Sequence, residues 1–173
     1  GANDYSIRKL VEYLGEDSFN DGDIVISNYP YWNAAHTYDA TLTAPVFDQE
    51  GILFGFLLVR AHWMDLGAKD PGYVLDSTDM HQEGLIFPGT KLVKRRIVDQ
   101  ELIELIRFNS RMPDVVIGDF NAMVASIRSG ERRMQEVLRK FGRELVEQSI
   151  VQILDFAERG TARALMDLPQ GSW

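Results

Sequence analysis

The sequence contains no cysteine, only three histidines in 173 residues, and no long apolar run. Without cysteine the chain can form no disulfide and offers no thiolate ligand for zinc and no cysteine nucleophile. No segment has the length of a membrane-spanning helix, and the first residues lack the basic start and apolar core of a secretory signal. We therefore expect a soluble, cytoplasmic protein that does not enter a membrane.

The sequence also lacks the two common glycine-rich phosphate loops, G-x-x-x-x-G-K-[ST] and G-x-G-x-x-G. If the chemistry needs a nucleotide, we expect another chain to bind it. The formal net charge of −8 disfavours a broad phosphate-binding surface, so nucleic acid and anionic membranes are not expected partners. A small-molecule substrate remains compatible with this charge.

The apolar pattern predicts an α+β fold, with an antiparallel hairpin or sheet and irregular loops followed by a long C-terminal helical hairpin. Residues 1–98 are predicted to be β-rich and to carry the functional site, and residues 99–173 to be helical. Together they form one domain or part of a larger subunit. Helices are expected at 5–14, 100–108, 114–140 and 144–168, the last with Leu145, Ile150, Ile153, Leu154 and Phe156 facing inward.

Three strands are predicted at residues 24–26, 41–47 and 52–59, the last two joined by a turn. The strand at 52–59 is almost continuously apolar, which indicates burial on both faces. Pro45 cannot donate a ladder hydrogen bond, so it favours an edge position or an irregularity in its strand.

Two similar strings, His36-Thr-Tyr-Asp39 and His62-Trp-Met-Asp65, each place a carboxylate three residues after an imidazole. Imidazole and carboxylate are ligands of zinc and manganese when no thiolate is available. If Phe47 pairs with Ile52, Asp39 and His62 become diagonal neighbours on one face of the hairpin. His36 joins them only if the chain leaves the regular strand before Tyr38, or if a bulge shifts the register.

Each of these features also has a purely structural interpretation. A histidine near a strand end commonly hydrogen-bonds a neighbour, and the His-x-x-Asp string by itself specifies no geometry. Asp65 could cap a turn. The loop with Tyr29, Tyr31 and Trp32 could form a pocket wall beside the metal, or could pack on itself.

Several motifs occur together and in the order of one known family. They are Gly22-Asp-Ile-Val-Ile-Ser-Asn28, Pro30-Tyr31, His36-x-x-Asp39, Thr43-Ala-Pro-Val-Phe47, Arg60-Ala-His62-x-x-Asp65-x-Gly67, Gln82-Glu-Gly84-Leu85, Lys91-Leu92 and Gly130-Glu-Arg-Arg133. With these motifs the chain resembles the hydantoinase B/oxoprolinase family over essentially its whole length. This family includes large subunits of acetone and acetophenone carboxylases, N-methylhydantoinases and caprolactamase-like enzymes.

The resemblance implies a division of labour between subunits. A hydantoinase A-like partner would bind ATP and phosphorylate the substrate, and the hydantoinase B-like part would act on the activated intermediate at a divalent metal, Zn or Mn. His36, Asp39 and His62 match the family's metal ligands. Asp65 and Glu83 are then candidate catalytic residues in contact with the substrate or the ligands, and Tyr29, Tyr31, Trp32 and Arg60 are candidate substrate-pocket residues.

Two departures from the family pattern affect this expectation. The family's Asn-Asp-Pro-Tyr reads Asn28-Tyr-Pro-Tyr31 here, and its Gly-Gly-Thr-His reads Ala34-Ala35-His36, preceded by Asn33, which suggests an enclosed apolar pocket and favours an acetophenone carboxylase-like enzyme. Family members are also several times longer and carry an upstream acidic motif. The chain is therefore expected to be a piece of a subunit or a short divergent one, inactive in isolation.

Three functions are compatible with the sequence. The first is the metal-binding part of an ATP-dependent ketone carboxylase subunit. The second is part of an ATP-dependent hydantoinase, oxoprolinase or lactamase that hydrolyses a cyclic amide. The third is a non-catalytic structural module of a hetero-oligomer.

Overall fold

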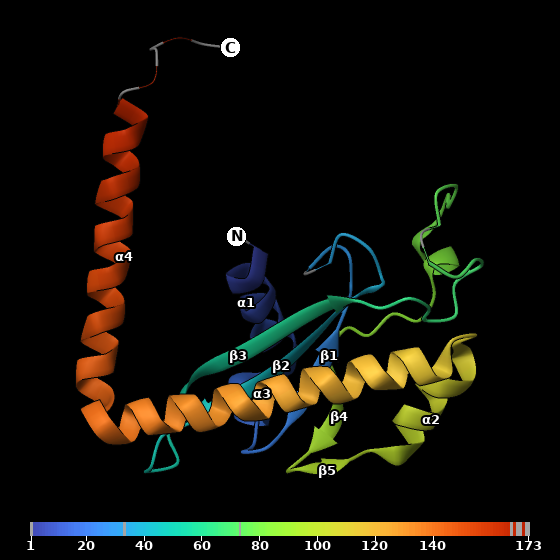
Figure 1. Cartoon of the computed structure of the whole chain (residues 1–173), viewed down its shortest axis with the longest axis horizontal. Coiled ribbons are helices and arrows are strands. Elements are labelled where there is room, and N and C mark those ends of the chain that lie inside the picture. Colours follow the sequence, from blue (N-terminus) through green and yellow to red (C-terminus); the bar gives the residue numbers. More distant parts are fainter. Residues whose placement is uncertain (1, 33, 73, 167, 169–170, 172–173) are drawn as a thin grey trace. The chain divides into compact units, whose positions relative to one another are not determined.

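The computed structural model describes residues 2–32, 34–72, 74–166, 168 and 171, and it confirms the predicted α+β class (Figure 1). The strands are β1 (Ile24–Ser27), β2 (Asp39–Phe47), β3 (Leu53–His62), β4 (Thr90–Lys94) and β5 (Ile97–Val98). The α-helices are α1 (Ala2–Leu14), α2 (Gln100–Asn109), α3 (Pro113–Phe141) and α4 (Arg143–Met166), and two 3₁₀ turns are η1 (Glu16–Ser18) and η2 (Met80–Glu83). The predicted helices and strands therefore form close to their expected positions.

The five strands form one antiparallel sheet in the order β3-β2-β1-β4-β5. The prediction that 52–59 is buried on both faces is wrong, because β3 lies at the sheet edge and all its residues are only partly buried. Of the two strands of the hairpin, the inner strand β2 is almost completely buried. Pro45 lies in this inner strand and not at an edge, but its pairing to β1 has ended at Thr43 and a bulge follows at Val46/Phe47.

The predicted register of the β2-β3 hairpin is wrong by two residues, since Phe47 pairs with Leu53 and Asp39 pairs with His62. Ile52 belongs to the turn: its N–H donates to Oδ1 of Asp48, and its carbonyl accepts from the N–H of Asp48. The bulge at Val46/Phe47 adds a second residue of shift. An even shift keeps the same side chains on the same face of a strand, so Asp39 and His62 still share a face.

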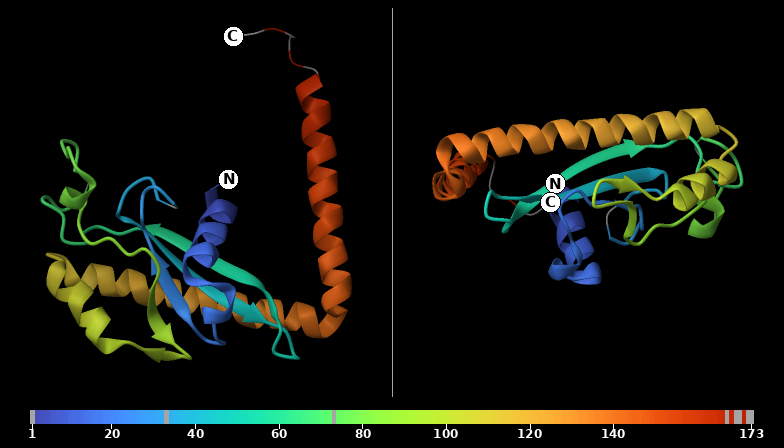
Figure 2. Two further views of the ribbon diagram at one scale, coloured as in Figure 1. Left: turned by 180° about the vertical axis from the view of Figure 1, so that it is seen from behind. Right: turned by 90° about the horizontal axis from the view of Figure 1, so that it is seen from below.

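Helix α1 covers one face of the sheet (Figure 2, right). A small buried cluster forms there from Leu10 of α1, Phe19 after η1, and Val25 of β1. Phe56 of β3 packs against it. The periodic apolar positions of α1 thus bury against a strand face that is otherwise largely polar, and Gly15, with φ of 83°, ends the helix.

Helices α2 and α3 cover the opposite face, where the main core lies (Figure 2). Side chains that alternate along β1 and β2 face this core, because successive residues of a strand point to opposite faces. The fully or almost fully buried members from the strands are Ile24, Ile26, Ala40, Leu42, Ala44, Leu92 and Val93, and those from the helices are Ile103, Ile106, Val116, Phe120, Met123 and Ile127. Asp99 caps α2 as predicted, since its carboxylate accepts from the N–H of Leu102.

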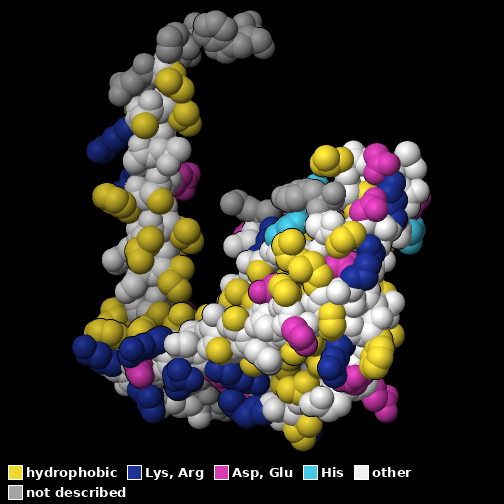
Figure 3. Space-filling model, turned by 45° about the vertical axis from the view of Figure 1, so that its right-hand side comes forward, with side chains coloured by type: hydrophobic (Ala, Val, Ile, Leu, Met, Phe, Trp, Pro, Cys, Tyr) yellow, Lys and Arg dark blue, Asp and Glu magenta, His cyan; other side chains and the backbone are white. Residues whose placement is uncertain are grey.

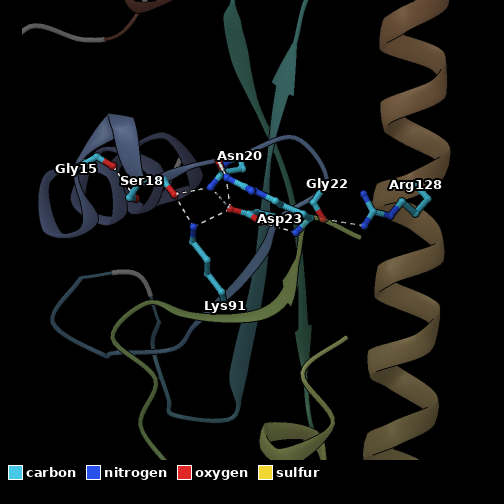
Figure 4. A network of polar contacts seen from close by, with 8 residues as sticks. Gly15, Ser18, Asn20, Gly22, Asp23, Lys91 and Arg128 are labelled. Atoms are coloured by element: carbon cyan, nitrogen blue, oxygen red, sulfur yellow. Dashed lines mark hydrogen bonds and ion pairs between the residues drawn. The ribbon is translucent and has the colours of Figure 1, made fainter. Parts of the chain in front are cut away.

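A buried carboxylate joins the start of β1 to β4 (Figure 4). Asp23 is 1% exposed, and its Oδ2 lies 2.7 Å from Nζ of Lys91 and accepts from the N–H of Asn20. Its Oδ1 accepts from the N–H of Arg95. Burial raises the pKa of Asp23, but the hydrogen bonds from Lys91, Arg95 and Asn20 outweigh this effect and hold the pKa below its ordinary value.

The chain divides into two compact units, residues 1–133 and residues 134–173, with the boundary inside α3. In the second unit, no residue of α4 is buried, so the expected inward packing of its apolar side chains is wrong. Leu145, Ile150, Ile153, Leu154 and Phe156 are 43–75% exposed, and hydrophobic side chains line α4 in Figure 3. Their helical spacing is real, but the described residues of this unit leave that face of α4 exposed.

Among the described residues, no helix combines the length and the apolar composition needed to cross a membrane.

Candidate functional site

The end of the β2-β3 hairpin carries a directly paired carboxylate and imidazole. Asp39 and His62 are cross-strand partners, and Oδ1 of Asp39 lies 3.0 Å from Nδ1 of His62. The sequence predicted that these two residues share a face as diagonal neighbours; the structure places them directly opposite one another. Both side chains are mostly buried, with 18% of Asp39 and 26% of His62 exposed.

The backbone of the preceding turn holds the second oxygen of Asp39. Its Oδ2 accepts from the N–H groups of Ala35 and His36. Burial raises the pKa of Asp39, but the hydrogen bonds from His62 and from these two backbone groups lower it by more. The pKa therefore lies below the ordinary value. The carboxylate is therefore ionised at neutral pH and can only accept, so Nδ1 of His62 carries the proton that is shared between them.

His36 lies in that same turn and faces His62. The two ring centroids are 5.9 Å apart and the rings are nearly perpendicular, with an interplanar angle of 89°. The N–H of Asp39 donates to the carbonyl of His36, so the chain leaves the strand just before Asp39. This is the condition under which the sequence predicted that His36 would join the other two residues.

These residues fit a divalent metal in donor type, because imidazole nitrogen and carboxylate oxygen are both ligands of Zn and Mn. In their present arrangement, however, the described part of the chain contains no group of three or more histidine, aspartate or glutamate side chains that could hold a metal ion. Asp39 is instead placed to orient His62. A carboxylate in this position typically fixes the tautomer of a functional histidine.

Tyr38 packs against the ring of His62 and was not identified from the sequence. It is 1% exposed, its ring centroid is 5.4 Å from that of His62, and its hydroxyl donates to the carbonyl of Asp70. Burial and the negative charges of Asp65 and Glu83 raise the pKa of Tyr38. Its position inside the His36-x-x-Asp39 string is the only sequence signal that could have indicated it.

Asn28 is the second residue whose importance only the structure reveals. It is completely buried, and its Nδ2 donates to the carbonyls of Thr37 and Leu85 while its Oδ1 accepts from the N–H of Phe87. Thr37, also buried, donates its hydroxyl to the carbonyl of Glu83. Together these bonds fix the turn that carries His36 and Asp39 against the segment at residues 83–87.

Asp65, predicted as a catalytic residue, is completely buried below the surface of the site. Its Oδ1 accepts from the N–H of Gly67, and its Oδ2 accepts from the N–H of Arg111 at 2.6 Å. The Arg111 guanidinium lies 3.4 Å from the same oxygen. Through these contacts Asp65 connects the loop after β3 to the segment that precedes α3.

Glu83, the other predicted catalytic residue, is only partly buried. Its Oε1 accepts from the hydroxyl of Ser77, and its backbone carbonyl accepts from Thr37. The side chain therefore lies within the irregular loop, and its backbone contacts the turn of the candidate site.

The aromatic residues predicted to line a substrate pocket pack on one another and on α1. The ring centroids of Tyr29 and Trp32 are 5.0 Å apart, and Trp32 lies 4.9 Å from Tyr13 of α1. Tyr31 contacts Tyr29 at 5.6 Å but is 75% exposed. These contacts agree with the self-packed interpretation of this loop and leave the face of Tyr31 available.

Three comparisons with known proteins agree on one family. The family model described as Hydantoinase B/oxoprolinase matches residues 1–173. The caprolactamase subunit beta of Pseudomonas jessenii is 30% identical over 164 residues, which cover 94% of this chain and 28% of that protein. A 5-oxoprolinase of Dictyostelium discoideum is 28% identical over 169 residues, which cover 97% of this chain and 13% of that protein.

Two solved structures have the same fold. The ATP-dependent caprolactamase from Pseudomonas jessenii matches with a TM-score of 0.90 and 27% identity over 99% of this chain and 29% of that chain. The nucleotide-free structure of acetone carboxylase, an enzyme of ATP-dependent acetone carboxylation, matches with a TM-score of 0.75 and 20% identity over 81% of this chain and 19% of that chain. The chain thus spans less than a third of the length of each of these relatives.

Proposed function

The chain belongs to the hydantoinase B/oxoprolinase family, and from this premise we propose that it forms the active-site part of a subunit that hydrolyses a cyclic amide in an ATP-dependent reaction. The match to caprolactamase supports this choice, since it is higher in both identity and TM-score than the match to acetone carboxylase. The observation that carries the proposal is the Asp39-His62 pair with the His36 ring beside it.

The chemistry of this pair follows from its hydrogen bonds. Asp39 accepts the Nδ1 proton of His62, so Nε2 is the ring nitrogen that can act as a base or as a ligand. His62 then takes a proton from the attacking water, or orients that water, while Asp39 stabilises the positive charge that develops on the ring. Tyr38 and Asn28 hold the pair and its turn in position.

As an alternative to this base role, we propose that a divalent metal, Zn or Mn, binds at His36, Asp39 and His62, which requires the hydrogen bond between Asp39 and His62 to open. When bound, it would polarise the substrate carbonyl and lower the pKa of a bound water. The donor types support this assignment. Metal analysis of the complete subunit, compared with His36→Ala and His62→Ala, tests it independently of turnover: loss of bound metal in both variants is expected, and unchanged metal content would exclude this site.

In this proposal the partner subunit, and not this chain, binds ATP. The sequence contains neither common phosphate loop, so a hydantoinase A-like ATP-binding subunit would activate the substrate carbonyl by phosphorylation. The proposed assay combines the complete subunit, this partner, ATP and a set of lactams and hydantoins. Ring opening that depends on ATP and is lost in His62→Ala is the expected result.

The second candidate function is carboxylation of a ketone, for which the aromatic cluster of Tyr29, Tyr31 and Trp32 is the favouring observation. The exposed ring of Tyr31 would suit contact with an aryl ketone better than contact with a small polar ring. The same assay with acetone or acetophenone and bicarbonate separates the two chemistries. Turnover of ketones without ring opening of amides would replace the first proposal by this one.

The non-catalytic alternative has a clear signature in the same experiment. If the chain serves only as a structural module, His36→Ala and His62→Ala would leave both assembly with the partner and turnover unchanged. Loss of turnover with assembly retained is what an active-site role requires.

A further inference from the structure

A row of polar side chains crosses the sheet directly beside the Asp39-His62 pair. Ser27 of β1 pairs with Thr41 of β2, and Thr41 pairs with Arg60 of β3. Residues two apart along a strand share a face and lie about 7 Å apart. Arg60 therefore lies on the same face of β3 as His62, two residues before it, and on the side of the sheet that α1 covers.

The guanidinium of Arg60 is held in a fixed orientation by two hydroxyl groups. Its Nε donates to Oγ1 of Thr41 at 2.9 Å, and its Nη2 donates to Oγ of Ser6 in α1 at 3.0 Å. Thr41 is completely buried and Ser6 is 2% exposed, so neither acceptor can easily move. These two bonds engage a minority of the five N–H donors of an arginine.

The charge of Arg60 differs from that of the other partly buried cations. Lys91 is paired with Asp23, and Arg128 is paired with Glu131. Arg60, by contrast, contacts only neutral hydroxyls among the described residues. A partly buried cation gains free energy when an anion reaches it, because hydroxyl acceptors orient a guanidinium but do not neutralise it.

We propose that Arg60 is the contact for an oxyanion carried by the substrate, either a phosphate or a carboxylate, bound beside His62. This inference rests on the proposed function for its substrate, and it adds the charge that the substrate must carry. A guanidinium whose plane is fixed on one edge offers its remaining N–H groups as a planar fork, which matches the two oxygens of a phosphate or carboxylate. Because Arg60 and His62 are about 7 Å apart along the strand, one small substrate could contact both of them.

The two sources of this oxyanion differ in when it appears. A phosphate would be present on a substrate already activated by the ATP-binding partner. A carboxylate would be present on the original substrate or would form when an amide ring opens. Both would approach the same guanidinium, so inorganic phosphate and acetate serve as separate probes for them.

The test measures anion binding and not turnover. The complete subunit is titrated with inorganic phosphate and, separately, with acetate at constant ionic strength, using calorimetry and the shift in melting temperature. Arg60→Gln should weaken binding of the preferred anion at least about tenfold, the effect of losing one charge-assisted contact. Arg60→Lys should recover part of it. Arg128→Gln is the matched control, because that partly buried arginine is already paired, and it should bind the anion like the wild type.

Each result has one meaning for this inference. Binding of phosphate alone assigns the site to an activated substrate, and binding of acetate alone assigns it to a substrate carboxylate. If the wild type binds neither anion, or if folded Arg60→Gln and Arg60→Lys both bind as well as the wild type, the inference is overturned. His62→Ala separates it from the proposed function: anion binding should persist there within about threefold while turnover is lost.

Discussion

Oδ1 of Asp39 lies 3.0 Å from Nδ1 of His62, although 23 positions separate the two residues along the chain. The β2-β3 hairpin produces this contact by placing them directly opposite one another at the open end of the two strands. Because the turn at His36 supplies two further N–H donors to Asp39, the carboxylate is fixed from both sides. A catalytic or metal-binding histidine requires this kind of support.

The first prediction concerns this supporting carboxylate. Asp39→Asn should keep the volume of the side chain but remove the negative charge that orients His62, and turnover or metal affinity of the complete enzyme should fall about 10–100-fold. Steady-state kinetics and metal titration of the variant measure the two effects.

Asp79→Asn is the matched control for this change. Asp79 and His81 form a second carboxylate-imidazole pair at 2.7 Å, but its side chains are 61% and 72% exposed and belong to the loop at η2. This variant should keep wild-type kinetics. Equal losses in the two variants would show that the Asp39-His62 pair has no special role.

A second prediction concerns stability in acid. The pKa of Asp23 lies below its ordinary value, so its charge stabilises the folded state above the unfolded pKa of about 3.9, and this contribution is lost as the pH falls toward the folded pKa. The free energy of unfolding should therefore decrease steeply below about pH 4 in the wild type. Asp23→Asn should be less stable at neutral pH and should show a flatter decrease.

Urea unfolding at a series of pH values measures both effects. Asp17→Asn removes an exposed carboxylate of η1 and is the control, with a profile expected to follow the wild type. Parallel profiles for wild type and Asp23→Asn would mean that the buried contact with Lys91 does not govern the acid response.

A third prediction concerns the hydrogen bonds of Asn28, which hold the turn that carries His36 and Asp39. Asn28→Ala removes three hydrogen bonds inside a fully buried environment, and it leaves the carbonyls of Thr37 and Leu85 and the N–H of Phe87 without their partner. The expected cost is about 2–5 kcal/mol, since each buried unsatisfied group costs about 1–3 kcal/mol.

Chemical denaturation gives this cost directly. Asn121→Ala, at an exposed position of α3, is the control and should change stability by less than about 0.5 kcal/mol. A small loss for Asn28→Ala would show that the turn at His36 is held by other contacts.

The fourth prediction separates backbone conformation from close packing. Gly84 and Gly15 both have positive φ angles, of 104° and 83°. A Cβ at Gly84 would lie 2.5 Å from the carbonyl oxygen of Leu66, which accepts from the N–H of Leu85, whereas a Cβ at Gly15 meets nothing within 4 Å.

Gly15→Ala should therefore cost only the conformational penalty, about 1–3 kcal/mol, and Gly84→Ala should cost distinctly more because the loop must move. Thermal and urea unfolding compare the two variants. If both lose the same stability, the approach of Leu66 is not restrictive and conformation alone explains these glycines.

Local features of the fold were predictable because short-range physics determines them. The spacing of apolar residues gave the helices, Asp99 marked the start of α2 through its cap, and the turn at residues 48–51 separated β2 from β3. The shared face of Asp39 and His62 was also predictable, since it depends only on the parity of the register.

The features that were missed depend on distant partners. The burial of β2 and the only partial burial of β3 follow from the strand order, which pairs β1 with both β2 and β4 and leaves β3 at the edge. Asn28 and Tyr38 are important because of contacts with residues 85–87 and 70, and no local pattern indicates those distances. The predicted burial along α4 failed for a related reason: a helical pattern shows which side chains share a face, but not whether another surface covers that face.

By itself the sequence determined which residues could do chemistry, namely two histidines each followed by a carboxylate, and the class of fold that would carry them. Tertiary structure decided their roles: Asp39 orients His62, Asp65 holds a buried joint at Arg111, and Arg60 is aligned by hydroxyls from β2 and α1. The physical reason is that a side chain's chemistry is its own, whereas its charge, orientation and accessibility are set by the neighbours that folding brings to it.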